Sequence, residues 1–396
     1  MKIRKIQASE RQEILEGDRY AYTNWTEEKI LNSDLDTIIP DQTLAVFIQG
    51  KIVAALTIHR FQQSLRGIVK EMGGIGGVWT YPEHRNQGYV KELLHVAFSE
   101  MKTHNQGLSM LMPFRQSFYQ KFGYATANSN LEIRVPVESL ITDFTDDFTW
   151  EYERLNATAV QSEFLEFMKL VTANQNHGMV IPIYWQRSQW QAATRDKQCV
   201  LVKRQGKIVA LGIYRIDSRV KERKIYLDHY FYTDIESRIR LFSFFAKHRD
   251  QINHIYLEVQ LGMNFQQWFG DVMTGYEVSI KFPPYMVRVI DLETAIHNLP
   301  TPVDGVINIQ IQDSSSNWHS QGFTLTSQHF LLHAKPDPNP NPDFRFTIQG
   351  ISALVYGTLP LAEIEYRNWL EVLNYQKRSL LASWFPPMPL SNTWRF

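Results

Sequence analysis

Residues 78–91 combine an apolar segment, a single glycine and the start of a helix, an order of residue types that can hold a phosphate group. Apolar residues recur from Val90 to Met101 with a period near 3.6, which predicts an amphipathic helix that begins close to Gly88. The first turn of a helix has unpaired backbone N–H groups and partial positive charge. We therefore expect the backbone around Gly88 to bind a pyrophosphate, with an ordinary strand-to-helix turn as the alternative.

A second motif further along the chain supports the phosphate-binding interpretation. Residues 108–112 read as a buried strand, and the sequence Phe-Tyr-Gln-Lys-Phe-Gly-Tyr follows at 118–124. Arg85, Gly88 and Val90 form the pattern Arg-x-x-Gly-x-small, which resembles the coenzyme A signature of the GCN5-related N-acetyltransferase (GNAT) superfamily. The motif at 118–124 resembles another element of the same superfamily. The usual signature ends in Gly or Ala, so Val90 departs mildly from it.

The composition narrows the class of protein. The chain has 396 residues, a length that fits two or three domains, and its 41 basic residues balance its 41 acidic ones. Zero net charge gives no electrostatic basis for binding nucleic acid or an anionic membrane. Cys199 is the single cysteine, and no apolar stretch in the sequence is long enough to span a bilayer. We expect a cytoplasmic protein that binds neither nucleic acid nor membrane.

The sequence Gln-Gly-Lys-Ile-Val-Ala occurs twice, at 49–54 and 205–210, each time between apolar segments that read as the strands of a hairpin. The helix expected after the second copy begins without a glycine. Asp234 and Glu236 place negative charge at its start, where they suit the helix dipole and oppose a pyrophosphate. The sequence therefore predicts a duplicated unit whose second copy has lost coenzyme binding.

The whole chain predicts a mixed α+β fold with domains at 1–150, 151–284 and 285–396. An intact coenzyme motif, a degenerate second copy and a third region that opens with Met-Val-Arg-Val-x-Asp together resemble the Eis-like (enhanced intracellular survival) acetyltransferases. That resemblance implies tandem GNAT domains, the second degenerate, followed by an α+β domain similar to sterol carrier proteins. It also implies hexamers and acetyl transfer from acetyl-CoA to a small-molecule amine, such as an aminoglycoside or polyamine.

The same resemblance implies roles for individual residues. Tyr119 matches the general acid, and the carboxylate of the last residue, Phe396, matches the general base. From the residues alone, a core tyrosine and a frayed chain end remain the alternatives. Tyr20, Tyr22 and Trp25 either border the acceptor cleft or pack a helix against the sheet. The residues implied in binding acetyl-CoA are Val78, Trp79, Thr80, Arg85, Asn86, Gln87, Gly88, Tyr89, Val90, Lys91, Phe114 and Arg115.

Two other functions stay open at this point. The first is a non-catalytic protein that senses acetyl-CoA or carries an apolar ligand, and the second is an acetyltransferase that acts on protein lysines. No metal is expected, because His329 and His333 lack a third ligand at metal-binding spacing. Direct attack of a neutral amine on the thioester requires a polarised carbonyl and a proton for the departing thiolate, and no covalent enzyme intermediate.

Overall fold

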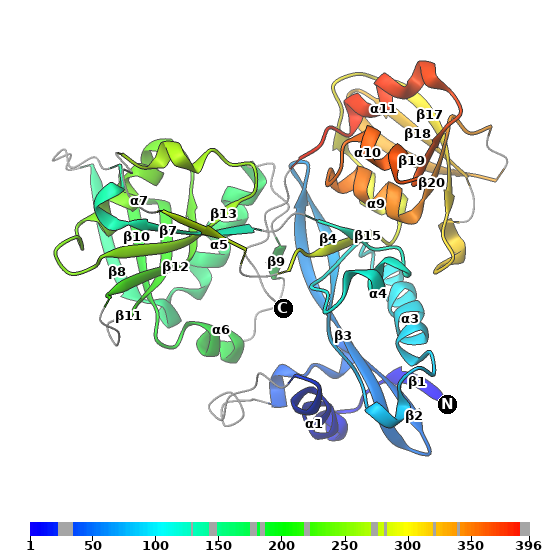
Figure 1. The fold of residues 1–396 in the computed structure, drawn as a ribbon, viewed down its shortest axis with the longest axis horizontal. Coiled ribbons are helices and arrows are strands. Elements are labelled where there is room, and N and C mark those ends of the chain that lie inside the picture. The colour runs from blue at the N-terminus through cyan, green and yellow to red at the C-terminus, as the bar shows by residue number, and fades with distance from the viewer. Residues whose placement is uncertain are drawn as a thin grey trace.

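Figure 1 shows the fold of the chain in a computed structural model. Within the residues that it describes, the strands form three sheets with helices packed on them, which confirms the mixed α+β prediction. The described residues are 1–22, 35–127, 130–141, 149–174, 180–182, 187–217, 222–270, 276–280, 283–319, 322–338 and 341–388.

The first sheet contains both predicted motifs, and its long strands β3 and β4 run through the right half of Figure 1. In spatial order its strands are β1 (Lys2–Lys5), β2 (Thr43–Ile48), β3 (Lys51–Leu65), β4 (Ile68–Thr80), β5 (Leu108–Leu111), β15 (Met286–Val289) and β6 (Ala125–Thr126), and β9 (Val180–Pro182) pairs with β3. Its helices are α1 (Arg11–Ala21), α3 (Tyr89–Thr103) and α4 (Gln116–Gln120). The buried side chains of α3 are those of the predicted apolar stripe, among them Leu93, Phe98 and Met101.

The second sheet lies on the other side of the molecule in Figure 1. Its strands, in spatial order, are β14 (Glu277–Ser279), β7 (Asn130–Pro136), β13 (His254–Gln260), β12 (Lys224–Tyr232), β11 (Lys207–Asp217), β10 (Gln198–Arg204) and β8 (Trp150–Asn156). The helices of this unit are α5 (Gln161–Asn174), α6 (Arg187–Thr194) and α7 (Ile235–Ala246). Cys199 is buried in β10, where burial raises the pKa of its thiol to about 12.

The two sheets repeat the same local geometry, as the duplication predicts. The hairpin turns at Gly50 and Gly206 both have positive φ, 83° and 74°, and each follows a glutamine with φ of 51°. A register shift occurs after Val46 in one hairpin and after Val202 in the other. In both units the strand after the hairpin pairs in parallel with the next strand along the chain. These pairs are β4 with β5 and β12 with β13. The similarity between the two units therefore covers the whole hairpin and the parallel strand pair that follows it, not only the six repeated residues.

The first two units exchange a strand. β7 follows the first sheet in the chain, yet it pairs with β13 of the second sheet. β15 follows the second sheet, yet it pairs with both β5 and β6 of the first. The chain therefore enters the second sheet by residue 130, before the expected boundary near 150. Apart from β9, it returns to the first sheet at residue 286, next to the expected boundary at 285. Local sequence patterns predict strands, but they do not reveal which distant strand each one pairs with.

The third sheet sits above the first in Figure 1, and one of its helices, α9, packs on β15 and β6 as well as on its own sheet. Its strands are β16 (Leu299–Pro300), β19 (Leu331–Asp337), β18 (Gly322–Gln328), β17 (Gly305–Gln312), β20 (Phe344–Thr347) and β21 (Leu370–Val372). The helices are α8 (Leu292–Ile296), α9 (Ile348–Tyr356), α10 (Leu361–Tyr366) and α11 (Arg378–Trp384). Within the described part of the chain, no helix combines the length and apolar character that crossing a membrane requires.

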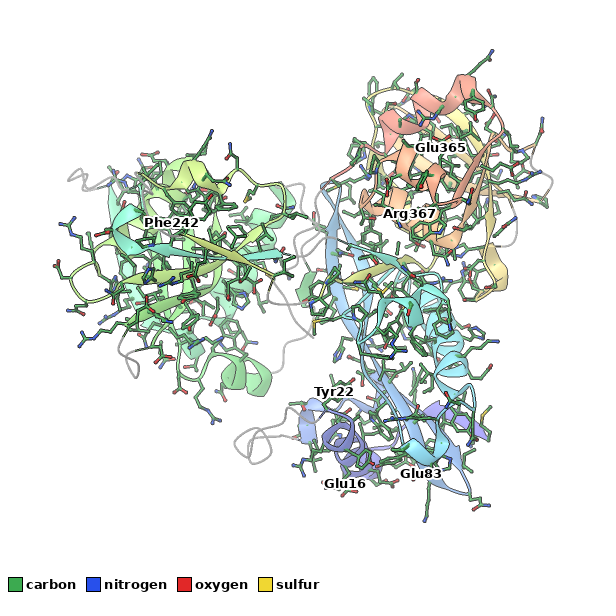
Figure 2. All side chains as sticks on the ribbon, in the orientation of Figure 1. Glu16, Tyr22, Glu83, Phe242, Glu365 and Arg367 are labelled. Carbon is green, nitrogen blue, oxygen red and sulfur yellow. The ribbon has the colours of Figure 1, made fainter. Side chains whose placement is uncertain are left out.

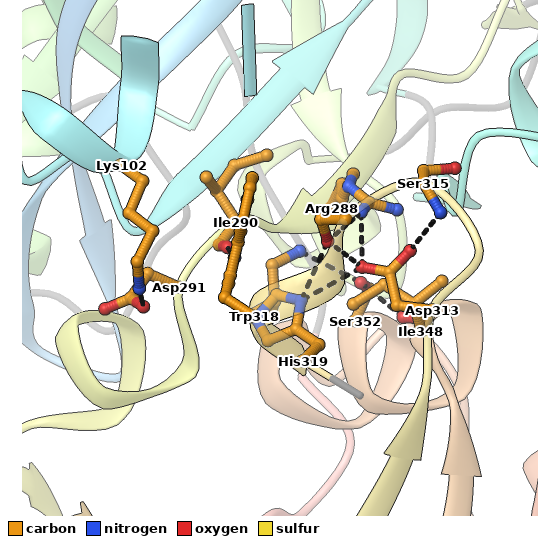
Figure 3. A network of polar contacts seen from close by, with 12 residues as sticks. Lys102, Arg288, Ile290, Asp291, Asp313, Ser315, Trp318, His319, Ile348 and Ser352 are labelled. Carbon is orange, nitrogen blue, oxygen red and sulfur yellow. Dashed lines mark hydrogen bonds and ion pairs between the residues drawn. The ribbon is translucent and has the colours of Figure 1, made fainter. Parts of the chain in front are cut away.

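A fully buried ion pair joins the first and third units, as Figure 3 shows. Arg288, in β15, donates from Nη2 to Asp313 Oδ2 at 2.6 Å and from Nη1 to the Phe122 carbonyl oxygen at 2.6 Å. His319 Nδ1 lies 3.0 Å from the same Asp313 oxygen. Burial opposes the charge on Asp313, but the hydrogen bond with His319 and the charge of Arg288 lower its pKa to about 2.

Replacing Arg288 by methionine is expected to destabilise the protein by about 3–5 kcal/mol, because the change leaves the Asp313 carboxylate buried without its cation. Thermal denaturation of the full chain measures the effect. Arg345→Met is the matched control, since Arg345 pairs with Glu371 at 3.1 Å on the surface, where an ion pair contributes about 1 kcal/mol or less. Equal shifts in melting temperature for the two variants would contradict a structural role for the buried pair.

Candidate active site

The N-terminus of α3 has the geometry of an anion site. Its N-cap, Gly88, has φ of 81°, and no side chain caps the helix. An added Cβ at Gly88 would meet no atom within 4 Å, so space lies open beside the turn. Asn86 also has positive φ, at 61°, and Tyr89 donates a hydrogen bond from its hydroxyl to Gln87. Unpaired first-turn N–H groups beside open space suit a pyrophosphate.

The equivalent helix of the second unit is already capped by its own residues. Asp234 accepts a hydrogen bond from the Ser237 backbone N–H at 2.8 Å, and the Ser237 hydroxyl accepts one from the Asp234 backbone N–H. Arg204 pairs with both Asp234 and Glu236. The sequence predicted this negative charge, and the structure adds that it satisfies the helix terminus. An incoming phosphate would have to displace it.

The edge of β4 beside α3 provides the second part of the site. β4 pairs with β5 only from Met72 to Ile75, so residues 76–80 extend beyond the paired segment. The Val78 carbonyl accepts a hydrogen bond from the Tyr22 hydroxyl at 3.2 Å, and the Thr80 carbonyl accepts one from Arg85 Nε at 3.3 Å. Both side chains are exposed enough to exchange these bonds for a ligand's. An extended chain with amide groups could pair with such an edge.

Tyr119 lies in α4 with 3% of its surface exposed, enclosed by aromatic rings. Phe114, Phe118 and Tyr124 have ring centroids 5.6, 5.1 and 6.2 Å from the Tyr119 ring. Burial, reinforced by the nearby Tyr22 and Tyr124, raises the pKa of Tyr119 above its usual range. The hydroxyl therefore carries its proton at every physiological pH.

Arg288 holds the second motif in place, a role that the sequence did not predict. Its guanidinium donates a hydrogen bond to the Phe122 carbonyl oxygen. It also lies over the Phe98 ring of α3, 4.4 Å from the ring centroid. A Cβ at Gly123, which has φ of 84°, would lie 1.7 Å from Arg288 Nη1. The glycine of the motif therefore makes room for this arginine. The only sequence signal was an arginine among the apolar residues of 286–289.

The remaining predicted residues lie at different distances from this centre. Trp79 is buried, with its ring against α1 at Gly17, and Tyr81 lies 5.0 Å from it. Tyr20 is exposed and packs edge-on to Tyr81, so it contacts the end of β4.

Phe114 is 72% exposed, and Arg115 is the N-cap of α4. Val90 and Lys91 are in the first turn of α3. Trp25 and Phe396 lie outside the described residues.

Comparison with known proteins gives the class of the first unit. The profile of an acetyltransferase (GNAT) domain matches residues 2–127, and no curated protein matches the chain. Three solved structures are similar over the whole chain. They are a GCN5-related N-acetyltransferase from Anabaena variabilis (16% identity, TM-score 0.86, 100% of both chains), a probable N-acyltransferase of unknown function from Enterococcus faecalis (18%, 0.83, 100% of this chain and 99% of that one) and Eis1 from Mycobacterium abscessus (14%, 0.79, 100% of both).

Residues 2–127 are therefore a GNAT acetyltransferase domain, and the complete chain shares its fold with GNAT proteins, Eis1 among them. A GNAT domain implies the use of acetyl-CoA or another acyl-CoA. The α3 terminus and the β4 edge fit that group, since one offers N–H groups to a pyrophosphate and the other offers strand hydrogen bonds to an amide chain. Among the described residues, no three His, Cys, Asp or Glu side chains are grouped to hold a metal ion.

Gly88→Asp is expected to weaken acetyl-CoA binding at least about tenfold, because it places a carboxylate where the second unit carries Asp234. Isothermal titration with acetyl-CoA measures the dissociation constant. Gly206→Asp is the control, since this glycine also has positive φ and open space, so the backbone cost is matched. Equal affinities for the two variants would place the pyrophosphate elsewhere.

Proposed function

We propose that the protein is an acetyl-CoA-dependent N-acetyltransferase that acetylates an amine of a small molecule of aminoglycoside or polyamine type. The observation that carries the proposal is the uncapped N-terminus of α3 beside the unpaired end of β4. The second unit has the same strands and a capped helix, so the open terminus is specific to the first. Bound acetyl-CoA would supply the acetyl thioester that the amine attacks directly.

The residues of the chain take three roles in this proposal. The α3 terminus around Gly88 binds the pyrophosphate, and the β4 edge at Val78 and Thr80 holds the pantetheine arm. Tyr119 Oη holds a proton for the departing sulfur. Because burial raises its pKa, this donation depends on a short approach and exclusion of water rather than on intrinsic acidity. The carboxylate of Phe396 is the proposed acceptor of the amine proton.

The chain leading to the tail is attached to the first unit, which supports a role for Phe396 there. Arg66, in the turn between β3 and β4, donates from Nη1 to the Pro386 carbonyl at 3.0 Å. The same guanidinium donates to the carbonyls of Leu354 and Val355 near the C-terminus of α9, where a cation is favourable. The Met388 backbone N–H donates to Gly357. These contacts fix where the last residues begin.

The Eis-like assignment belongs to the same proposal, with domains at 1–150, 151–284 and 285–396 that exchange β7 and β15. Its similarity in fold to Eis1 covers the entire chain, which is consistent with this assignment. The sterol-carrier-like third domain, the hexamer and the cytoplasmic location rest on the sequence alone.

Tyr119→Phe is expected to lower kcat by about 100-fold or more while leaving acetyl-CoA affinity unchanged, because it removes only the proton donor. Deletion of Phe396 is likewise expected to lower kcat and to leave acetyl-CoA affinity unchanged. Release of coenzyme A thiol with a panel of polyamines, aminoglycosides and lysine peptides measures the rates. Tyr366→Phe is the control, since Tyr366 is an exposed tyrosine on α10 of the third unit.

Three results would revise the proposal. Acetyl-CoA binding without turnover on any amine favours a sensor or carrier. Turnover on lysine peptides alone favours a protein acetyltransferase. Full activity of Tyr119→Phe removes that residue as the acid.

A further inference from the structure

Asp18 lies beside the candidate site but belongs to neither predicted motif. Its helix, α1, packs directly on β4, because a Cβ at Gly17 would lie 2.1 Å from the Trp79 ring. Asp18 Oδ1 then lies 3.7 Å from the position of a Cβ at Gly77, and Thr57 Oγ1 lies 3.4 Å from the same position. A Cβ at Gly77 would be in ordinary van der Waals contact with both atoms, so the carboxyl group faces β4 at a residue without a side chain. Asp18 is four residues after the buried Ile14, on the inner face of the helix.

Nothing in the described chain neutralises this carboxyl group. Asp18 Oδ1 is buried and has no hydrogen-bond partner among the described residues. Its neighbours are Thr57 from β3, Trp79 from β4 and Tyr22 from its own helix end. Burial raises the pKa of Asp18 to about 7, although the Trp79 indole N–H opposes the shift. A carboxylate oxygen that is buried without a partner is costly, and a cation bound beside it would reduce that cost.

The carboxyl group is continuous with the reacting centre through Tyr22. The negative charge of Asp18 helps to raise the pKa of Tyr22 to about 12, after burial as the main cause. Tyr22 in turn raises the pKa of Tyr119, and its hydroxyl donates to the Val78 carbonyl. Asp18, Tyr22 and Tyr119 are thus coupled electrostatically.

We propose that Asp18 is a binding site for a second ammonium group of the acceptor, so that the enzyme prefers diamines over monoamines. This inference rests on the proposed function. The acceptor places one ammonium on the Asp18 carboxylate, in the space beside Gly77 and Thr57, and presents its other amine past Tyr22 to the thioester. An ammonium favours the ionised carboxylate, so binding releases the proton that the free protein holds there. At pH 7 the release approaches about half a proton for each diamine bound.

Two measurements test the site with butane-1,4-diamine and butylamine, which have the same carbon chain and differ by one amine. Titration calorimetry of the full chain in Tris and in phosphate at pH 7 gives the protons released. Coenzyme A thiol release gives the ratio of kcat/KM for the diamine to that for the monoamine. Asp18→Asn is expected to abolish the proton release and to lower that ratio at least about tenfold, as expected for loss of a charge-assisted bond.

Glu16→Gln is the matched control, because this substitution also removes one negative charge, from the exposed face of the same helix (Figure 2). It is expected to leave proton release and selectivity unchanged. An unchanged ratio and unchanged proton release in Asp18→Asn overturn the inference while leaving the acetyltransferase proposal intact. Absence of turnover with these two amines and with every amine of the larger panel overturns the proposed function, and the calorimetry still decides the Asp18 site.

The stability of the free protein gives an independent readout. The folded Asp18 carboxyl has a pKa of about 7, above its ordinary value near 3.8, so the folded state holds the proton more tightly than the unfolded state. The resulting stabilisation is complete below pH 4 and is lost as pH rises towards and past 7. The melting temperature of the wild type, relative to Asp18→Asn, is therefore expected to fall between pH 4 and pH 8. An unchanged difference over this range would contradict the shifted pKa.

Discussion

The buried charge of Arg288 is the constraint on which much of this structure depends. Its strand, β15, returns from the far end of the chain to complete the first sheet, and its side chain reaches both the Phe122 carbonyl and Asp313. One guanidinium thus connects the motif that carries Tyr119, the helix α3 and the third unit. Because a buried ion pair is strongly destabilised when one partner is removed, the three parts are coupled energetically.

The two GNAT-like units show how one helix terminus can serve two purposes. In α7 the backbone N–H groups are satisfied by Asp234, and Arg204 balances the acidic charge there. In α3 the N-cap is a glycine with no side chain to supply an acceptor, and the terminus stays available to an external anion. A helix end is therefore either stabilised from within or kept open for a ligand, and the choice depends on one residue. The α3 terminus lacks the stability that a capping side chain would contribute, and binding of an anion can offset this loss.

Groups of opposite charge lie at different places around the candidate site. The α3 terminus offers partial positive charge on one side of β4, whereas Asp18 offers a carboxyl group near Gly77. The hydroxyls of Tyr22 and Tyr119 stay protonated, because burial raises the pKa of both. An anionic donor and a cationic acceptor could approach from these two ends and meet at Tyr119.

The sequence by itself determined the local elements and their chemical signals. The period of α3, the hairpin at Gly50, its repeat at Gly206 and the acidic start of α7 were all predictable, because each depends on residues close together in the chain. The aromatic motif around Tyr119 was also predictable, since the residues themselves resemble a known pattern. These features cover most of the fold class and the phosphate end of the candidate site.

Only the tertiary structure decided which distant parts meet. The exchange of β7 and β15 between the two sheets depends on pairing across more than a hundred residues. Arg288 and Asp18 look ordinary in the sequence, and their importance comes from burial and from the atoms that surround or fail to surround them. Periodicity reports the face on which a residue lies, whereas the partner of a buried charge is set by packing between elements.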